Sequence, residues 1–216
     1  MLARTRRAAS YLDLDDDDLR ALTAQAWLTA VPRNKFVFSK GETTNSIYVI
    51  HSGRVKELLY GKNGREFGIC VLGAGEFFGE MALDEGPRAV SVRALEPTLL
   101  FMVPQAAFTE YLAGHSQFAL RVIKTLLARQ RALLGQVEAL ASLNVYGRLA
   151  RLLLELATEE EGTLVIKDRL TTEEIANRVA ASREQIHRIL RDLAVGGYIH
   201  LENKRITIKK NLPTRW

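Results

Sequence analysis

The stretch that decides the fold is GEFFGEMALDEGPRAVSVRA, residues 75–94, which lies between segments that alternate like β-strands. Gly79 and the glycines near it let the backbone approach a ligand where a Cβ would collide. A short helical turn over Gly79–Leu83 would present free N–H groups and a positive dipole end to a phosphate. Arg88 adds a planar fork of donors for an anion, and Glu80 an acceptor for hydroxyl groups. A bulged hairpin with a surface arginine would explain any one of these residues, but the set at this spacing favours an anion site.

The same stretch closely resembles the phosphate-binding cassette of cyclic-nucleotide-binding domains. The resemblance implies that Glu80 binds the ribose hydroxyl and Arg88 the cyclic phosphate, with help from backbone N–H groups of Met81, Ala82 and Ala89. Bacterial cyclic-AMP receptors usually have serine at the position of Ala89. The alanine instead resembles the regulatory subunits of cyclic-AMP-dependent kinase, in which alanine accompanies a preference for adenine over guanine nucleotides. The cassette is one residue shorter than is common. The implied ligand site comprises Ile69, Cys70, Gly79, Glu80, Met81, Ala82, Arg88, Ala89, Arg129, Leu133 and Leu134.

Short apolar segments broken by Gly, Asn, Pro and Lys run from Pro32 to Val103 and predict strands. These segments are Phe36–Phe38, Ile47–Ile50, Val55–Tyr60, Phe67–Leu72, Val90–Leu95 and Leu99–Val103. Many short strands without helical periodicity predict a small barrel or sandwich. The run SKGETTNSIYVIHSGRVKE, residues 39–57, also resembles the β-roll of cyclic-nucleotide-binding proteins. Before it, the acidic residues 13–18 favour the start of a helix that runs through Ala26, because carboxylates stabilise a first helical turn.

Two helices are predicted after the strands. Pro104 at the first position and Gly114 beyond the end indicate a short helix. A second helix, from Ser116 to about Ala141, would be roughly 40 Å long. Its apolar positions are Phe118, Val122, Ile123, Leu126, Leu127, Leu133, Leu134, Val137 and Leu140. They cover more than one stripe, so one part can face the β-domain and another a second copy of the chain, although burial within one domain is an alternative.

Residues 144–147 interrupt the apolar periodicity and are a candidate hinge. Beyond them, a helix over Gly147–Ala157, an acidic turn and a short strand at Leu164–Ile166 precede two more helices. Each of these begins with a capping box, Thr171 with Glu174 and Ser182 with Gln185, and Leu170 with Ile175 forms a hydrophobic staple. Two short helices so closely joined predict a helix-turn-helix.

The second of these helices has two faces when its residues are placed about 100° apart. One arc carries Ile186, Ile189, Leu190 and Leu193, and the other carries Arg183, Glu184, His187, Arg188 and Arg191. Any surface helix shows such a division. The content of the charged arc is more specific. A recognition helix contacts base edges from its first turns, where arginine binds guanine and a carboxylate binds cytosine.

SREQIHRIL, residues 182–190, closely resembles the recognition helix of the cyclic-AMP receptor protein and fumarate–nitrate regulator family of bacterial transcription regulators. The resemblance extends over most of the chain and implies a TGTGA-like half-site. It also implies a wing over Tyr198–Ile208 with residues 202–204 at its tip. Ala180 departs from the glycine common in the turn, which would cost about 1 kcal/mol in a left-handed conformation. The implied DNA contacts are Thr171, Ser182, Arg183, Glu184, His187, Arg188, Lys204 and Arg205.

The predicted fold class is therefore α+β, with three parts. Residues 1–115 form an N-terminal helix and a β-roll of the cyclic-nucleotide-binding type. Residues 116–144 form a long dimerisation helix and a hinge, and residues 145–216 form a winged helix-turn-helix domain that binds DNA.

Composition limits the other possibilities. The 216 residues carry a net charge of +5, which permits a polyanionic partner. The single cysteine, Cys70, excludes an internal disulfide and argues against the iron–sulfur oxygen sensors of the family. The four histidines lack metal spacing, so no metal site is expected. We expect a cytoplasmic protein, since the chain shows no signal peptide and no apolar run of membrane-spanning length.

The expected function is an effector-gated regulator that binds palindromic DNA as a homodimer and meets RNA polymerase. Cyclic AMP is the leading effector. Leu133 and Leu134 replace the two hydroxyl residues that meet adenine in the family, although Arg129 is retained, so a cyclic dinucleotide, another effector or none are alternatives. A regulatory subunit that gates a protein partner is a second hypothesis, against which the helix-turn-helix argues. No nucleophile–base pair or Walker-type loop indicates an enzyme.

Overall fold

The structure is a computed structural model that describes residues 16–23, 26–61, 64, 66–160, 162–167, 170–202 and 205–213. The chain divides into two compact units between Leu133 and Leu134, within the long helix α3 (Ser116–Ser142). Each unit is described by itself. In the described part of the chain, none of the helices has both the length and the apolar character needed to cross a membrane.

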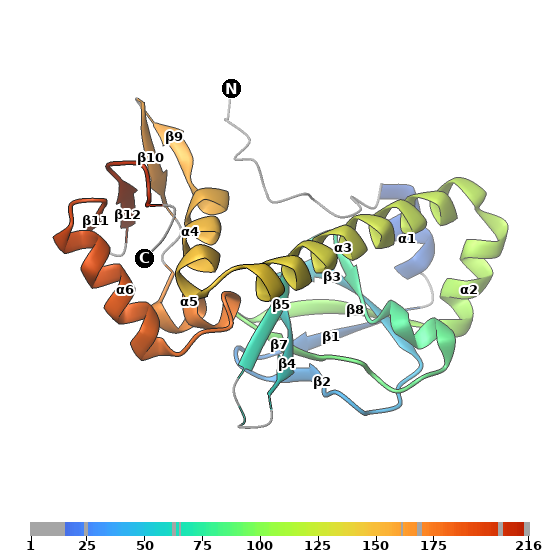
Figure 1. Cartoon of the computed structure of the whole chain (residues 1–216). Helices are drawn as coiled ribbons and strands as arrows, with labels where there is room; N and C mark the ends of the chain where they lie inside the picture. Colours follow the sequence, from blue (N-terminus) through green and yellow to red (C-terminus); the bar gives the residue numbers. More distant parts are fainter. Residues whose placement is uncertain are drawn as a thin grey trace. The chain divides into compact units, whose positions relative to one another are not determined.

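The first unit contains, within its described residues, two four-stranded antiparallel sheets, ordered β1-β8-β3-β6 and β2-β7-β4-β5 (Figure 1). The strands are β1 (Trp27–Val31), β2 (Phe36–Phe38), β3 (Ser46–Ser52), β4 (Arg54–Tyr60), β5 (Glu66–Gly73), β6 (Phe77–Phe78), β7 (Ser91–Ala94) and β8 (Thr98–Pro104). All six predicted strands are present, which confirms the β-roll. Two strands were not predicted from the sequence. β6 has only two residues, and the first four residues of β1 are exposed and show no alternation of burial.

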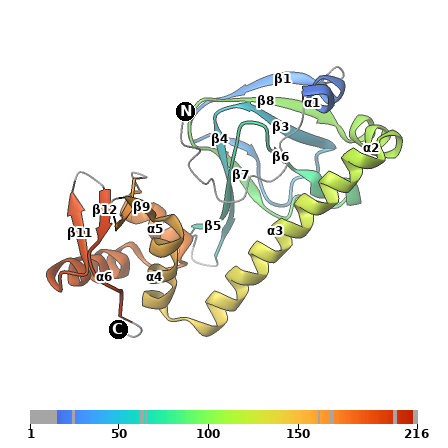
Figure 2. The same cartoon turned by 90° about the horizontal axis from the view of Figure 1, so that it is seen from above.

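The core of this unit has two layers that share β3. Tyr48 and Ile50 face the space between the sheets, where Tyr48 stacks on Phe78 at 5.1 Å between ring centroids. Ile47 and Val49 face the other way, toward a cluster that includes side chains of α1 (Asp16–Thr23), α2 (Gln105–Gly114) and α3. In Figure 2 these helices border the sheet that contains β1, β8 and β3. Burial on both faces explains why β3 is a continuous apolar run.

Three helix boundaries of the first unit differ from those predicted. Pro104 is the N-cap of α2 and not its first residue, and Gly114 is the last helical residue and does not lie beyond the end, because His115 is the C-cap. The described part of α1 covers Asp16–Thr23, and Ala26, the predicted last residue, is not helical. The acidic residues 13–15 of that prediction lie outside the described part of the chain.

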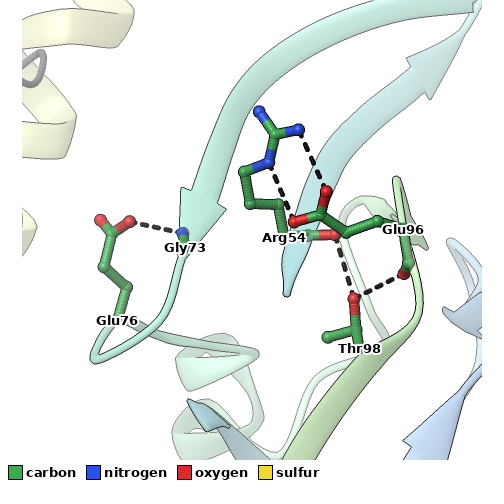
Figure 3. Close-up of polar contacts among 5 residues, drawn as sticks. All are labelled: Arg54, Gly73, Glu76, Glu96 and Thr98. Atoms are coloured by element: carbon green, nitrogen blue, oxygen red, sulfur yellow. Dashed lines mark hydrogen bonds and ion pairs between the residues drawn. The ribbon is translucent and has the colours of Figure 1, made fainter. Parts of the chain in front are cut away.

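Short polar contacts fix the loops beside the quoted stretch (Figure 3). Glu76 accepts a hydrogen bond from the backbone N–H of Gly73 at 2.7 Å, which closes the turn after β5. Arg54 pairs with Glu96 at 3.1 Å, and the Thr98 hydroxyl donates to the Glu96 carbonyl at 2.8 Å. These contacts tie the start of β4 to the start of β8.

The second unit is a winged helix-turn-helix, as predicted. Its elements are α4 (Val145–Leu156), β9 (Thr158–Glu160), β10 (Thr163–Ile166), α5 (Thr172–Arg178), α6 (Arg183–Val195), β11 (Ile199–Glu202) and β12 (Arg205–Ile208). The described strands form one sheet ordered β11-β12-β10-β9, in which β11 and β12 are the wing. β9 occupies the region predicted as an acidic turn.

The predicted hinge coincides with a break between α3 and α4. Asn144 has an extended conformation, and its side chain accepts from the N–H of Gly147 at 2.8 Å. This N-cap starts α4 at Val145, two residues before the predicted start, because an asparagine side chain satisfies a helix N–H that would otherwise lack a partner.

Candidate ligand-binding and nucleic-acid-binding sites

The predicted helical turn is present as the 3-10 helix η1 (Glu80–Asp84). Gly79 precedes it with φ 79°, and a Cβ at this position would lie 2.9 Å from Nη1 of Arg88, so the position requires glycine. The N–H of Ala82 donates to the Gly79 carbonyl at 3.1 Å. Ala82 is 2% exposed. This N–H, which the resemblance assigned to a ligand, is therefore engaged inside the turn.

Arg88 is 3% exposed, which rules out the alternative of a surface arginine. Its Nε donates to Thr44 Oγ1 at 2.7 Å, its Nη1 to the Gly79 carbonyl at 2.6 Å and its Nη2 to the Ser46 carbonyl at 2.5 Å. The guanidinium carbon lies 4.2 Å from the ring centroid of Phe38. Burial lowers the pKa of Arg88. Three of the five N–H groups serve the protein, so a ligand would meet the other two.

Glu80 and Arg129 form a nearly buried ion pair, with 3.2 Å between Oε1 and Nη1. Arg129 also donates from Nη2 to the Phe77 carbonyl at 2.6 Å and lies over the Phe77 ring. The second carboxylate oxygen of Glu80 is buried and has no hydrogen-bond partner among the described residues. An incoming hydroxyl group is a suitable donor for this oxygen, because a buried acceptor without a donor is unfavourable.

Cys70 lies beside this pair, together with a carboxylate that the sequence did not single out. The Cys70 thiol donates to Oε2 of Glu57 at 3.2 Å. Burial raises the pKa of the Glu57 carboxyl, and the charge of Glu80 raises it further. Burial and the neighbouring Glu57 raise the pKa of the Cys70 thiol, which is thus protonated and unreactive.

Alternation could not identify Glu57, because two adjacent charges, Lys56 and Glu57, occur in the strand and either could point inward. Strand register shows that Glu57 shares the inward face of β4 with Val55. Glu57 pairs with Val92 and Val55 pairs with Ala94, and Val55, Val92 and Ala94 are fully buried. A bulge opposite Glu57, where Ile69 is the extra residue of β5, interrupts the ladder.

The structure brings Cys70, Glu80 and Arg129 together, and it places Arg88 next to Gly79. Met81 is exposed, as is Ala89. Ile69 is half-buried. Leu133 and Leu134 lie on exposed positions of α3, 41% and 60% exposed, on either side of the division between the units.

The two helices of the second unit begin as predicted. The Thr171 hydroxyl accepts from the N–H of Glu174 at 3.1 Å, and Glu174 accepts from the N–H of Thr171 at 2.6 Å. Ser182 and Gln185 repeat this exchange, both at 3.1 Å. Both capping boxes are confirmed.

The two faces of α6 are also confirmed. One face is buried in the core of the unit: Ile186, Ile189, Leu190 and Leu193. The opposite face is exposed: Arg183, Glu184, His187, Arg188 and Arg191. An open hollow of about 470 Å³ borders this face near the wing, and His187, Val195 and Leu201 are among its lining residues. The exposed face thus offers cations, one carboxylate and an apolar edge.

Arg148 is a structural residue that the sequence reading did not recognise. Its Nη1 donates to the Leu143 carbonyl at the end of α3 at 2.7 Å, and its Nε donates to the Val179 carbonyl at 2.8 Å. Nη2 lies 3.4 Å from the Ala180 carbonyl. One guanidinium therefore joins the break after α3 to the turn that precedes α6.

Ala180 has φ 51°, the left-handed conformation anticipated for this turn. We expect Ala180→Gly to stabilise the protein by about 1 kcal/mol, because glycine lacks the Cβ that makes this region unfavourable. Ala132→Gly, at an exposed position inside α3, should instead cost about 1 kcal/mol. Urea unfolding followed by circular dichroism measures both, and equal signs for the two variants would contradict the assignment of strain.

The wing provides less free charge than the sequence indicated. Arg205 forms an ion pair with Glu160 at 2.6 Å, and Lys167 pairs with the same carboxylate. These cations lower the pKa of Glu160, the hydrogen bond from Lys167 most of all. Arg205 is exposed, but Glu160 already compensates part of its charge. Lys204, the other predicted wing contact, lies outside the described residues.

Comparison with known proteins assigns a domain family to each unit. Residues 28–115 match the cyclic nucleotide-binding domain family, and residues 147–210 match the Crp-like helix-turn-helix domain family. A CRP-like cAMP-activated global transcriptional regulator of Mycobacterium tuberculosis is 33% identical over 207 residues, which cover 94% of this chain and 92% of that protein. The cAMP-activated global transcriptional regulator Vfr of Pseudomonas aeruginosa is 30% identical, over 78% of this chain and 82% of that protein.

Solved structures have the same fold. The c-di-GMP responsive global regulator CLP of Xanthomonas campestris matches with a TM-score of 0.79 and 24% identity, over 91% of this chain and all of that one. A CooA mutant of Carboxydothermus hydrogenoformans matches with a TM-score of 0.76 and 19% identity, over 92% of this chain and 94% of that one.

Proposed function

The chain belongs to the cyclic-AMP receptor protein and fumarate–nitrate regulator family of transcription regulators, and we propose that it reads a palindromic DNA site as a homodimer in response to cyclic AMP. The observation that carries the proposal is the exposed face of α6, with arginines and Glu184 in its first two turns. These side chains suit guanine and cytosine edges in the major groove. The protein acts in the cytoplasm, with RNA polymerase as a further partner.

Two groups of the first unit support an anionic, hydroxyl-bearing effector. Arg88 is a buried cation that still has N–H groups to offer, and charge-assisted hydrogen bonds to phosphate are strong in such surroundings. Glu80 has a buried oxygen that accepts from no described residue, which suits a ribose hydroxyl. Both assignments follow the family pattern. The relatives named above are cAMP-activated, which favours cyclic AMP as the effector.

A cyclic dinucleotide is the second candidate. Leu133 and Leu134 present only apolar atoms, which can pack against a base but cannot hydrogen-bond its edge. The structural neighbour from Xanthomonas campestris is described as c-di-GMP responsive. Calorimetric titration of the full chain with cyclic AMP, cyclic GMP and cyclic di-GMP distinguishes these effectors, and heat with none of them would remove the effector from the proposal.

Exposed apolar residues of α3 support the homodimer. Leu120, Ile123, Leu127, Leu134 and Val137 are each at least 43% exposed. Their spacings of three, four, seven and three residues place them on one seam of a coiled coil. A second copy of the same helix buries this seam by symmetry. Residue 130, the remaining position of the seam, is a glutamine.

The effector would act by shifting the equilibrium between two conformations of the protein. A ligand held by the first unit and by α3 favours one arrangement of the reading helices over another, and the break at Asn144 is where the chain can turn. A regulatory subunit that controls a protein partner and does not bind DNA is a weaker candidate. Such a subunit would need neither α6 nor the wing.

We expect Glu184→Ala to relax the preference for one base pair in each half-site. A good contact to a base edge contributes roughly 1 to 3 kcal/mol of discrimination. Selection from random DNA measures the preference, and the wild type should recover a palindrome with half-sites about one helical turn apart. Glu155→Ala, which removes an exposed carboxylate of α4, is the control and should leave the preference unchanged. No palindrome, or an unchanged preference in Glu184→Ala, would contradict this role of α6.

A further inference from the structure

The proposed effector site contains more negative charge than one anionic ligand requires. Glu57 of β4 accepts a hydrogen bond from the Cys70 thiol of β5, and the charges of Glu80 of η1, Glu76 of the loop after β5 and Arg129 of α3 act on its carboxyl. Within the described part of the chain, these are the titratable and charged groups whose fields act on the Glu57 carboxyl. Two further carboxylate charges thus act on Glu57, and the one guanidinium among these groups already pairs with Glu80.

The carboxylates differ in what holds them. Glu80 has Arg129 at 3.2 Å, and Glu76 accepts the Gly73 N–H at 2.7 Å (Figure 3). Glu57 accepts from the Cys70 thiol at 3.2 Å. A thiol is a weak donor, so it stabilises a carboxylate less than a cation or an amide does. Glu57 is therefore the member of the cluster whose charge is least supported.

We propose that Glu57 makes effector binding proton-coupled, so that an anionic nucleotide binds together with one proton taken up by this side chain. The inference rests on the proposed function, since it concerns the same site. A cyclic phosphate brings a further negative charge close to the cluster, and like charges that share a poorly solvated site favour protonation of one of them. Protonated Glu57 also carries an O–H, which adds a donor to the site.

The direction of the pH dependence follows from the free protein. Burial, and then the charge of Glu80, raises the pKa of Glu57 before any ligand is present. The ligand raises this pKa further. Affinity is therefore constant below the pKa of the free protein, falls as the pH rises from that value to the pKa of the complex, and levels off above it. The slope is at most about tenfold per pH unit for one proton.

Glu57 also affects the stability of the free protein. Its pKa in the folded state lies above the value in the unfolded chain. The contribution of Glu57 to stability is thus fully present below the unfolded pKa and is lost as the pH rises through the folded pKa. Glu57→Gln removes this loss, because the amide keeps the shape of the side chain and does not ionise.

The test is calorimetric titration of the full chain with cyclic AMP from about pH 5.5 to about pH 8, in buffers of different ionisation enthalpy that count the protons taken up. The wild type should take up as much as one proton, and its affinity should fall with rising pH. Glu57→Gln should take up none and bind with an affinity independent of pH. Glu96→Gln, a substitution of an exposed carboxylate paired with Arg54, should behave like the wild type.

The outcomes separate the two claims. Equal proton uptake in the wild type and Glu57→Gln would overturn the role of Glu57 while leaving cyclic AMP as the effector. Absence of heat at every pH in both proteins would overturn the choice of cyclic AMP and, with it, the coupling. Thermal unfolding of the free proteins over the same pH range checks Glu57 without a ligand, and identical profiles for the wild type and Glu57→Gln would also overturn the inference.

Discussion

Replacing Arg88 by leucine is expected to weaken cyclic-AMP binding by roughly 2 to 4 kcal/mol, or about 30- to 1,000-fold. Arg88 is the buried cation of the quoted stretch, and leucine would leave the phosphate without its charged partner in a poorly solvated site. The substitution also removes the donors to the carbonyls of Gly79 and Ser46. We therefore expect a lower melting temperature as well, because a buried carbonyl without a donor costs about 1 to 3 kcal/mol.

Arg54→Leu is the matched control. Arg54 is an exposed arginine of the same unit whose partner is Glu96, so its loss should change neither affinity nor melting temperature by much. Titration calorimetry at a temperature where Arg88→Leu remains folded separates lost binding from lost structure. Equal affinity of Arg88→Leu and the wild type would show that Arg88 does not hold the phosphate.

Replacing Leu127 and Leu134 together by aspartate is expected to convert the dimer to monomers. Both leucines lie on the exposed seam of α3. Burying a leucine contributes roughly 2 kcal/mol, so the four leucines of a symmetric dimer contribute about 8 kcal/mol. Aspartates facing each other add repulsion. The monomer would hold a single reading helix, so its affinity for a palindrome should fall by several orders of magnitude.

Light scattering after size exclusion measures this change at micromolar concentration. Leu154→Asp is the control, since Leu154 of α4 is 51% exposed but lies off the seam, and this variant should remain dimeric. A monomeric wild type at that concentration, or a dimeric double variant, would contradict the assignment of the seam.

Local sequence signals predicted much of this molecule correctly. The capping boxes at Thr171 and Ser182 mark helix starts because the side chains satisfy backbone groups within three residues. The glycine common at position 180 in similar turns raised the case of a left-handed Ala180, and the structure has this conformation. Such features depend on neighbours along the chain, so sequence alone indicates them.

Features that depend on distant partners were not predicted. The inward course of Arg88 depends on the Ser46 carbonyl, the Thr44 hydroxyl and the Phe38 ring, all more than forty residues earlier in the chain. The register of β4 places Glu57 at the site. The sequence did not indicate whether Lys56 or Glu57, which are adjacent, would face inward. The resemblance implied a DNA contact for Arg205, and no local signal indicated that Glu160, forty-five residues away, compensates part of its charge. The roles of side chains in the candidate site therefore cannot be predicted without the tertiary structure, although the strands that carry them can.

The three carbonyls held by Arg148 have a consequence for how this regulator can evolve. The same guanidinium contacts the end of α3 and the turn that sets the start of α6. A substitution at residue 148 therefore changes the joint after α3 and the orientation of α6 in a single step. Selection on the response to an effector and selection on the preferred promoter cannot act separately at this position. Independent adjustment of the two traits is left to residues that take no part in this bridge of hydrogen bonds, such as Arg88 in the first unit and Arg188 on the exposed face of α6.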